Sequence, residues 1–172
     1  MVATLILTVT GHDRPGVVSA LSATITAHGA SWEVSQLSQV AGRFAGSVLV
    51  GVPDDHLDAL VADLNALNAP GLQIDLERTD EPVEQESLQL QLELLGADRP
   101  GIVAQISASL AAHGVNIDEL TTDVRDAPMA GGTLFEARAV LSAPPETSTD
   151  DLRSLLEQLG DEMMVEIRVS EG

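Results

Sequence analysis

The 172-residue sequence contains no cysteine, which excludes disulfides, thiol catalysis and cysteine-ligated metals. Aromatic residues make up only 2% of the chain, whereas apolar residues make up 44%. A hydrophobic core must therefore be built from Leu, Val, Ile and Ala. No apolar run approaches the ~18 residues that suggest a membrane-spanning helix, so we expect no membrane segment.

Basic residues are also scarce, because 8 Lys and Arg stand against 27 Asp and Glu, which gives a net charge of −19. Binding of DNA or RNA requires clustered basic side chains for the phosphates, and aromatic side chains for stacked bases. The sequence has neither, so we expect no direct contact with nucleic acid or with anionic membranes. The acidic excess fits a self-repelling surface, a saline cytoplasm or a basic partner, and composition alone does not separate these.

The N-terminus carries no sign of a secretory leader. Met1 leads directly into an alternating strand pattern, without the basic segment and apolar run of a signal peptide. We therefore expect a cytoplasmic protein without a leader.

The sequence contains an internal duplication with an offset of 85 residues, the distance from Asp13 to Asp98. Gly-His-Asp-Arg-Pro-Gly at 11–16 returns as Gly-Ala-Asp-Arg-Pro-Gly at 96–101, and 11 of the 24 positions that start with these segments are identical. Each copy follows an alternating apolar run and opens a helical pattern that ends at His-Gly. The chain is therefore interpreted as two copies of one unit.

The Asp-Arg-Pro-Gly turn predicts a helix start. Proline suits the first helical turn, because its φ is already helical and it lacks an N–H that would have no partner there. Asp13 and Asp98 are expected to accept hydrogen bonds from the first backbone N–H groups, while Gly16 and Gly101 allow close approach of backbone or ligand. The positive end of a helix suits a carboxylate. The alternative is a well-capped helix start that binds nothing.

Hydrophobic periodicity predicts the order β-α-β-β-α-β in both units. In the first unit we expect strands at 2–10, 31–40, 44–52 and 72–76, and helices at 15–28 and 53–67. In the second we expect strands at 88–94, 116–125, 133–142 and 165–169, and helices at 100–113 and 148–159, with a turn at Gly160. The boundaries are 1–78 for unit 1, an acidic linker at 79–87, and 88–172 for unit 2. This order gives a four-stranded antiparallel sheet with both helices on one face.

Four features together resemble an ACT domain. They are the first strand, the Asp-Arg-Pro-Gly-(Val/Ile)-Val turn, the helix that ends at His-Gly, and the Asn116-Ile117 pair that opens the next strand. The resemblance covers both units and implies an α+β chain of two ferredoxin-like βαββαβ domains. ACT domains are regulatory modules that bind small ligands, often amino acids, at interfaces between paired domains. They also occur without a ligand, as assembly surfaces.

A pair of such domains without a catalytic domain resembles the glycine cleavage system transcriptional repressor family, through the Trp32 region, the turn at 42–46 and the loop at 127–131. Similar pairs accompany phosphoserine phosphatases and uridylyl-removing sensors. The resemblance implies a co-repressor that responds to glycine or another small amino acid and acts through a protein partner such as a transcription activator. It also implies a homo-oligomer formed through pairing of ACT sheets.

By the family pattern, ligand contacts come from the turn and from the start of the second strand. The implied residues are Asp13, Arg14, Gly16, Val17, Ser31 and Trp32 in unit 1, and Asp98, Arg99, Gly101, Ile102, Asn116 and Ile117 in unit 2. Ser31 stands where Asn116 stands, and Asn offers a longer amide with both a donor and an acceptor. We therefore favour unit 2 as the binding unit. The alternative to ligand contact is an ordinary surface ion pair for Arg14 and Arg99. For Trp32 the alternative is a position in the core or at an interface.

Other sites are poorly supported. The adjacent His12-Asp13 occurs in metal-dependent phosphohydrolases, but such enzymes need further His and Asp ligands, and unit 2 has Ala97 in place of His12. We expect no catalytic residues, no metal and no cofactor. A ligand-free ACT assembly, or a regulatory subunit of a metabolic enzyme, remains the alternative function, and an enzyme is the least favoured interpretation.

Overall fold

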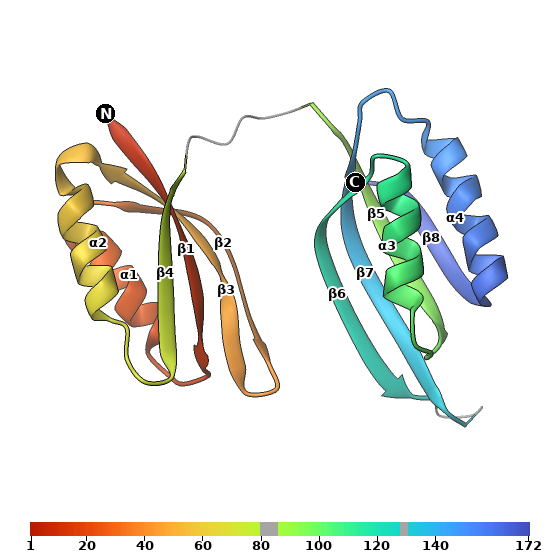
Figure 1. Cartoon of the computed structure of the whole chain (residues 1–172), viewed down its shortest axis with the longest axis horizontal. Coiled ribbons are helices and arrows are strands. Elements are labelled where there is room, and N and C mark those ends of the chain that lie inside the picture. The colour runs from red at the N-terminus through yellow and green to blue at the C-terminus, as the bar shows by residue number, and fades with distance from the viewer. Residues whose placement is uncertain (80–85, 128–130) are drawn as a thin grey trace. The chain divides into compact units, whose positions relative to one another are not determined.

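The computed structural model describes residues 1–79, 86–127 and 131–172, and the chain divides into two compact units, Met1–Val83 and Glu84–Gly172 (Figure 1). The linker expected at 79–87 falls mostly on residues outside the described ranges, so the expected domain boundaries stay a prediction. Residues 128–130 of the loop at 127–131 also lie outside the described residues.

Both units have the element order that periodicity predicts. Unit 1 contains β1 (Val2–His12), α1 (Val17–Ala27), β2 (Ser31–Val40), β3 (Arg43–Pro53), the short 3-10 helix η1 (Asp54–His56), α2 (Leu57–Ala66) and β4 (Leu72–Thr79). Unit 2 contains β5 (Leu88–Ala97), α3 (Ile102–Ala112), β6 (Asn116–Asp126), β7 (Thr133–Ala143), α4 (Thr149–Met163) and β8 (Val165–Glu171).

Each unit forms one four-stranded antiparallel sheet. The strand orders are β2-β3-β1-β4 and β6-β7-β5-β8, so that the corresponding strands occupy corresponding places. Both helices of each unit lie on one face of its sheet, and the other face is open (Figure 1). The predicted fold, two ferredoxin-like units, is therefore confirmed, and β2 and β6 are edge strands with unpaired backbone groups.

The cores are aliphatic, as the shortage of aromatic residues requires. Alternate residues of β1 such as Leu5 and Leu7 are buried under α1 and α2, where Leu21 and Leu60 pack against them. Unit 2 repeats the arrangement around Leu90, with Phe135 as its one aromatic core residue. Each fully buried Leu contributes about 1.5–3 kcal/mol, which makes this layer the main source of stability.

The end of α4 differs from the expectation. Gly160 lies inside the helix, which runs on to Met163, so Asp161 and Glu162 are helical and do not form a turn. The glycine is needed for space, because a Cβ at this position would lie 2.8 Å from the carbonyl oxygen of Val165. The close packing of β8 against α4 therefore explains Gly160, which the sequence pattern had suggested as the end of the helix.

Candidate functional site

The two Asp-Arg-Pro-Gly turns start their helices later than predicted. α1 begins at Val17, after Gly16 with φ 98°, and α3 begins at Ile102, after Gly101 with φ 94°. A left-handed glycine directly after proline is typical of a type II turn. The prolines therefore precede the helices, and the prediction that they occupy the first helical turn is wrong.

The starts of α1 and α3 are uncapped. The N-caps are Gly16 and Gly101, which have no side chain, and within the described residues the carboxylates of Asp13 and Asp98 accept no hydrogen bond from the first helical turn, so the prediction that they cap these helices is wrong. By contrast, Ser148 Oγ at the start of α4 accepts a hydrogen bond from the Asp151 N–H at 3.2 Å, and two acidic residues follow in the first turn. α1 and α3 have no acidic residue there, so their first N–H groups and positive helix ends are left for another anion.

The aspartates of the turns are instead held by their main chain. The Asp13 N–H donates to the Gly42 carbonyl oxygen at 3.0 Å, and the Asp98 N–H donates to the Thr133 carbonyl oxygen at 2.9 Å. Both carboxylate-bearing residues remain exposed. Each turn is thus fixed to the sheet end where the second strand stops and the third begins.

The two arginines of the turns differ. The Arg99 Nη2 donates to Gln105 Oε1 at 3.1 Å, one turn into α3, while unit 1 has Ala20 at the position of Gln105 and Arg14 is exposed. Within the described residues neither arginine forms an ion pair, so the surface ion pair that was their alternative is not found.

Four of the predicted site residues have their side chains in or against the core. Val17 and Ile102 are 6% and 2% exposed, and Trp32 and Ile117 pack half-buried against their respective cores. These residues can offer a ligand mainly their backbone. Trp32 is thus a core-packing residue, which agrees with the alternative given for it.

The structure does not bring the two predicted groups of one unit together. Asn116 lies opposite Ser142, which pairs with Gln89, whereas Asp98 follows Ala97 at the other end of β5. The eight residue steps from Gln89 to Ala97 correspond to about 26 Å of strand. Ser31 and the turn of unit 1 are separated in the same way, because Ser31 is level with Thr4.

A β-bulge organises the start of β6, and sequence reasoning missed its consequence. The register shifts between Ile117 and Glu119, and the Asn116 Nδ2 donates to Asp118 Oδ1 at 2.7 Å. The Ser142 hydroxyl donates to the same oxygen at 2.8 Å. Strand faces are predicted from alternation, and a bulge interrupts that alternation, so the pattern did not indicate that Asn116 and Asp118 are in contact. The only signal in the sequence was the Asn-x-Asp spacing.

The edge of unit 2 beside α3 carries exposed apolar side chains. Val103, Leu120 and Val124 are 42%, 45% and 50% exposed. Unit 1 keeps the first of these as Val18, but has Ser35 and Gln39 at the positions of the other two. Exposed apolar groups along an edge strand are typical of a strand that pairs with another chain.

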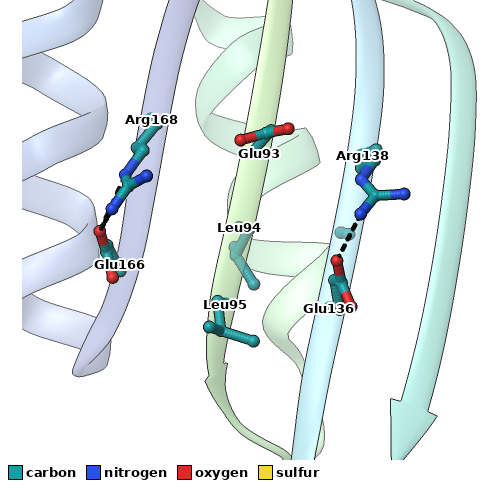
Figure 2. A pocket seen from close by; sticks show the side chains of 8 residues that line it. Glu93, Leu94, Leu95, Glu136, Arg138, Glu166 and Arg168 are labelled. Atoms are coloured by element: carbon teal, nitrogen blue, oxygen red, sulfur yellow. Dashed lines mark hydrogen bonds and ion pairs between the residues drawn. The ribbon is translucent and has the colours of Figure 1, made fainter.

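A shallow pocket of about 160 Å³ lies on the open face of unit 2 (Figure 2). Arg138 forms an ion pair with Glu136 at 2.8 Å on β7, and Arg168 pairs with Glu166 on β8, on either side of Glu93. None of the predicted site residues lines it. Since its four flanking charges are already paired, along their own strands and, for Glu136, also with Arg125 of β6 at 3.1 Å, this face is better explained as a solvated charged surface than as a ligand site.

The histidines connect the helices of unit 1. His28 Nε2 lies 2.7 Å from Asp63 Oδ2, and His56 Nδ1 lies 2.7 Å from the His28 carbonyl oxygen, which joins the end of α1 to α2. Among residues 1–79, 86–127 and 131–172, no group of three His, Asp or Glu side chains is arranged to hold a metal ion. No helix in that part of the chain is long and apolar enough to cross a bilayer.

Comparisons with known proteins match both units. A family model described as "ACT domain" matches residues 3–77 and again 89–170. Phosphoserine phosphatase SerB2 of Mycobacterium tuberculosis is 36% identical over 150 residues, which are 82% of this chain and 34% of the phosphatase. The chain thus spans about a third of the phosphatase's length.

Two further relatives span the whole chain or nearly so. The glycine cleavage system transcriptional repressor of Escherichia coli is 23% identical over 166 residues, which are 92% of this chain and 85% of the repressor. A crystal structure of an unknown protein from Galdieria sulphuraria is 30% identical with a TM-score of 0.88, and covers 100% of this chain and 99% of that chain.

Proposed function

The chain belongs to the ACT-domain family, with one such domain in each unit, and from this premise we propose that it is an amino-acid-responsive regulatory protein. The finer proposal is a co-repressor of the glycine cleavage system type, which acts through a protein partner such as a transcription activator. The similarity to the Escherichia coli repressor over 85% of that protein supports it. The net charge of −19 supports action without direct contact to DNA.

The observation that carries the proposal is the uncapped start of α3. Its first N–H groups and positive helix end suit the carboxylate of an amino acid. Asp98 and Asn116 offer oxygens to an ammonium group. A small zwitterion such as glycine satisfies both requirements, and unit 2 has the fuller set because Ser31 replaces Asn116 in unit 1.

We further propose that a second copy of the chain completes the site. The turn and Asn116 of one unit 2 lie about 26 Å apart along the sheet. If the β6 edges of two copies pair antiparallel, the start of one strand lies beside the end of the other. That end, at Asp126, is next to Thr133, which holds Asp98, so pairing would reduce the separation of the two groups from about 26 Å to about three strand spacings, or ~14 Å.

A second candidate function is the regulation of an enzyme. The 36% identity to part of a phosphoserine phosphatase favours it, because ACT units of this kind also occur in that protein. In this role the pair either senses an amino acid or acts only as an assembly surface. Ligand binding separates the sensing roles from pure assembly.

The test is a thermal-shift screen of the twenty amino acids and the purine bases at millimolar concentration. A ligand at about 100 times its Kd stabilises the folded state by about 2.7 kcal/mol, which raises Tm measurably. Asp98→Ala and Asn116→Ala should abolish the shift while the variants stay folded, and Ser31→Ala is the matched control. If no compound raises Tm, the sensor proposal fails and the assembly role is favoured.

The co-repressor role has a separate test. The purified chain should not shift a DNA fragment at physiological salt, and should do so only together with a DNA-binding partner. A shift by the chain alone would contradict the charge argument.

A further inference from the structure

Asn116, Asp118 and Ser142 form a small hydrogen-bonded network at the start of β6. Asp118 stands in the bulge, and its Oδ1 accepts from the Asn116 Nδ2 at 2.7 Å and from the Ser142 hydroxyl at 2.8 Å. Asn116 and Ser142 are also direct partners across β6 and β7. Both bonds end on a carboxylate oxygen, and such charge-assisted hydrogen bonds are stronger than neutral ones.

This network selects one orientation of the Asn116 amide. An ionised carboxylate only accepts hydrogen bonds, so the amide must present its NH₂ group to Asp118, and the flipped amide would place oxygen against oxygen. The Asn116 Oδ1 is then kept for other donors. Asp118 Oδ2 has no hydrogen bond or ion pair within the described residues, so its negative charge favours a cationic group at the same place.

Unit 1 lacks the whole network, although it keeps the fold and the bulge. Ser31, Glu33 and Gly51 occupy the corresponding positions, and Ser31 pairs with Gly51 as Asn116 pairs with Ser142. The Glu33 Oε1 lies 2.3 Å from where a Cβ on Gly51 would stand, so the end of the Glu33 side chain occupies the place that the Ser142 side chain has in unit 2. Since unit 1 folds with the same topology, the fold does not require the network.

We infer that Asp118 is a positioning residue, which holds the Asn116 amide oxygen ready for the ammonium group of the effector, and that only unit 2 recognises this group. The inference rests on the proposed function, because it takes Asn116 to contact the effector. The inference narrows the effector to small molecules that carry both an ammonium and a carboxylate group, and disfavours hydroxy acids of the same size, because a neutral hydroxyl gains no attraction from the charge of Asp118.

The test is isothermal titration of the full chain with glycine, L-alanine and L-serine, and with glycolate, in which a hydroxyl group replaces the ammonium of glycine. The wild-type chain should bind at least one of the amino acids, and bind glycolate at least about tenfold more weakly than glycine. Asp118→Ala frees the amide to turn its NH₂ group outward. It should lower affinity for the amino acid about tenfold and remove most of the discrimination against glycolate.

Glu33→Ala is the matched control, because Glu33 holds the corresponding position in unit 1. This variant should change neither the affinity for the amino acid nor the discrimination against glycolate. Asp118→Asn keeps an acceptor oxygen but removes the charge, so this variant should bind the amino acid better than Asp118→Ala does. It also replaces the alanine variant in the test if that variant does not fold. A purely structural role of Asp118 would lower stability without changing the selectivity between glycine and glycolate.

The outcomes separate the inference from the proposed function. If Asn116→Ala abolishes binding but both Asp118 variants keep the wild-type affinity and selectivity, the inference is overturned and the proposed function stands. If the wild-type chain binds none of these compounds and none of the other amino acids, both are overturned.

Discussion

Two glycines determine what the starts of α1 and α3 present to solvent. Gly16 and Gly101 have φ of 98° and 94°, and nothing lies within 4 Å of a Cβ built on either of them. Their requirement is therefore conformational and not steric. A left-handed residue here turns the chain into the helix and leaves its first N–H groups uncapped.

Gly101→Ala tests this requirement at the scale of one residue. Because alanine in left-handed geometry costs about 1 kcal/mol, we expect a loss of that size in the free energy of unfolding. Urea unfolding followed by circular dichroism measures it, with Gly16→Ala as the counterpart in unit 1. An unchanged free energy in both variants would show that the turns tolerate another geometry.

The helix caps give a second prediction for single side chains. Ser148 caps α4, so Ser148→Ala should lower the free energy of unfolding by about 1 kcal/mol. Asp98 caps nothing, so Asp98→Ala should leave stability unchanged and affect only effector binding. The same urea experiment measures both variants. A large loss of stability in Asp98→Ala would mean that its carboxylate does cap α3.

At the scale of elements, alternation and helical spacing were enough to predict the order and number of strands and helices. They were not enough for details that depend on three-dimensional contacts. The bulge at Asp118, the late helix start at Ile102 and the buried Gly160 inside α4 each arise from local geometry or from a neighbouring strand.

The candidate site was predictable only in part, for the same reason. The turns and the starts of β2 and β6 were named correctly as elements, but sequence does not show that they lie at opposite ends of one sheet. That separation follows from the register of β5, β6 and β7. Asp118 and Ser142 were missed because their contact joins two strands that are distant in sequence.

The packing of α4 on β8 predicts that a glycine-to-alanine change inside this helix lowers stability, although such a change normally raises it. Alanine has a helix propensity about 1 kcal/mol better than glycine, yet Gly160→Ala should destabilise unit 2. The new Cβ would lie 2.8 Å from the Val165 carbonyl oxygen, so backbone must move. Thermal unfolding should show a lower Tm, whereas the exposed Ser154→Ala in the same helix should change Tm little. A Tm raised by Gly160→Ala would contradict the packing described for β8.

At the scale of the whole molecule, the two units share a fold but differ at their edges. Unit 2 exposes Leu120 and Val124 on β6, where unit 1 has Ser35 and Gln39, whereas the exposed apolar residues on β2 of unit 1 are Val34 and Val40. We expect unit 2 to provide the pairing surface between chains.

Leu120→Asp tests this pairing surface, because a charge on the edge strand would oppose sheet pairing between copies. Light scattering coupled to size exclusion should give a dimer or larger species for the wild-type chain and a monomer for the variant. Ser35→Asp in unit 1 is the matched control and should not change the mass. A wild-type chain that is already monomeric would contradict pairing through β6.

The central claim is that unit 2 senses a small amino acid, and the stoichiometry of binding tests it most directly. Isothermal titration should give one amino acid bound per chain, with binding abolished by Asn116→Ala and kept by Ser31→Ala. Two molecules per chain would show that unit 1 binds equally well. Binding that survives Asn116→Ala, or no heat with any of the twenty amino acids, would contradict the account.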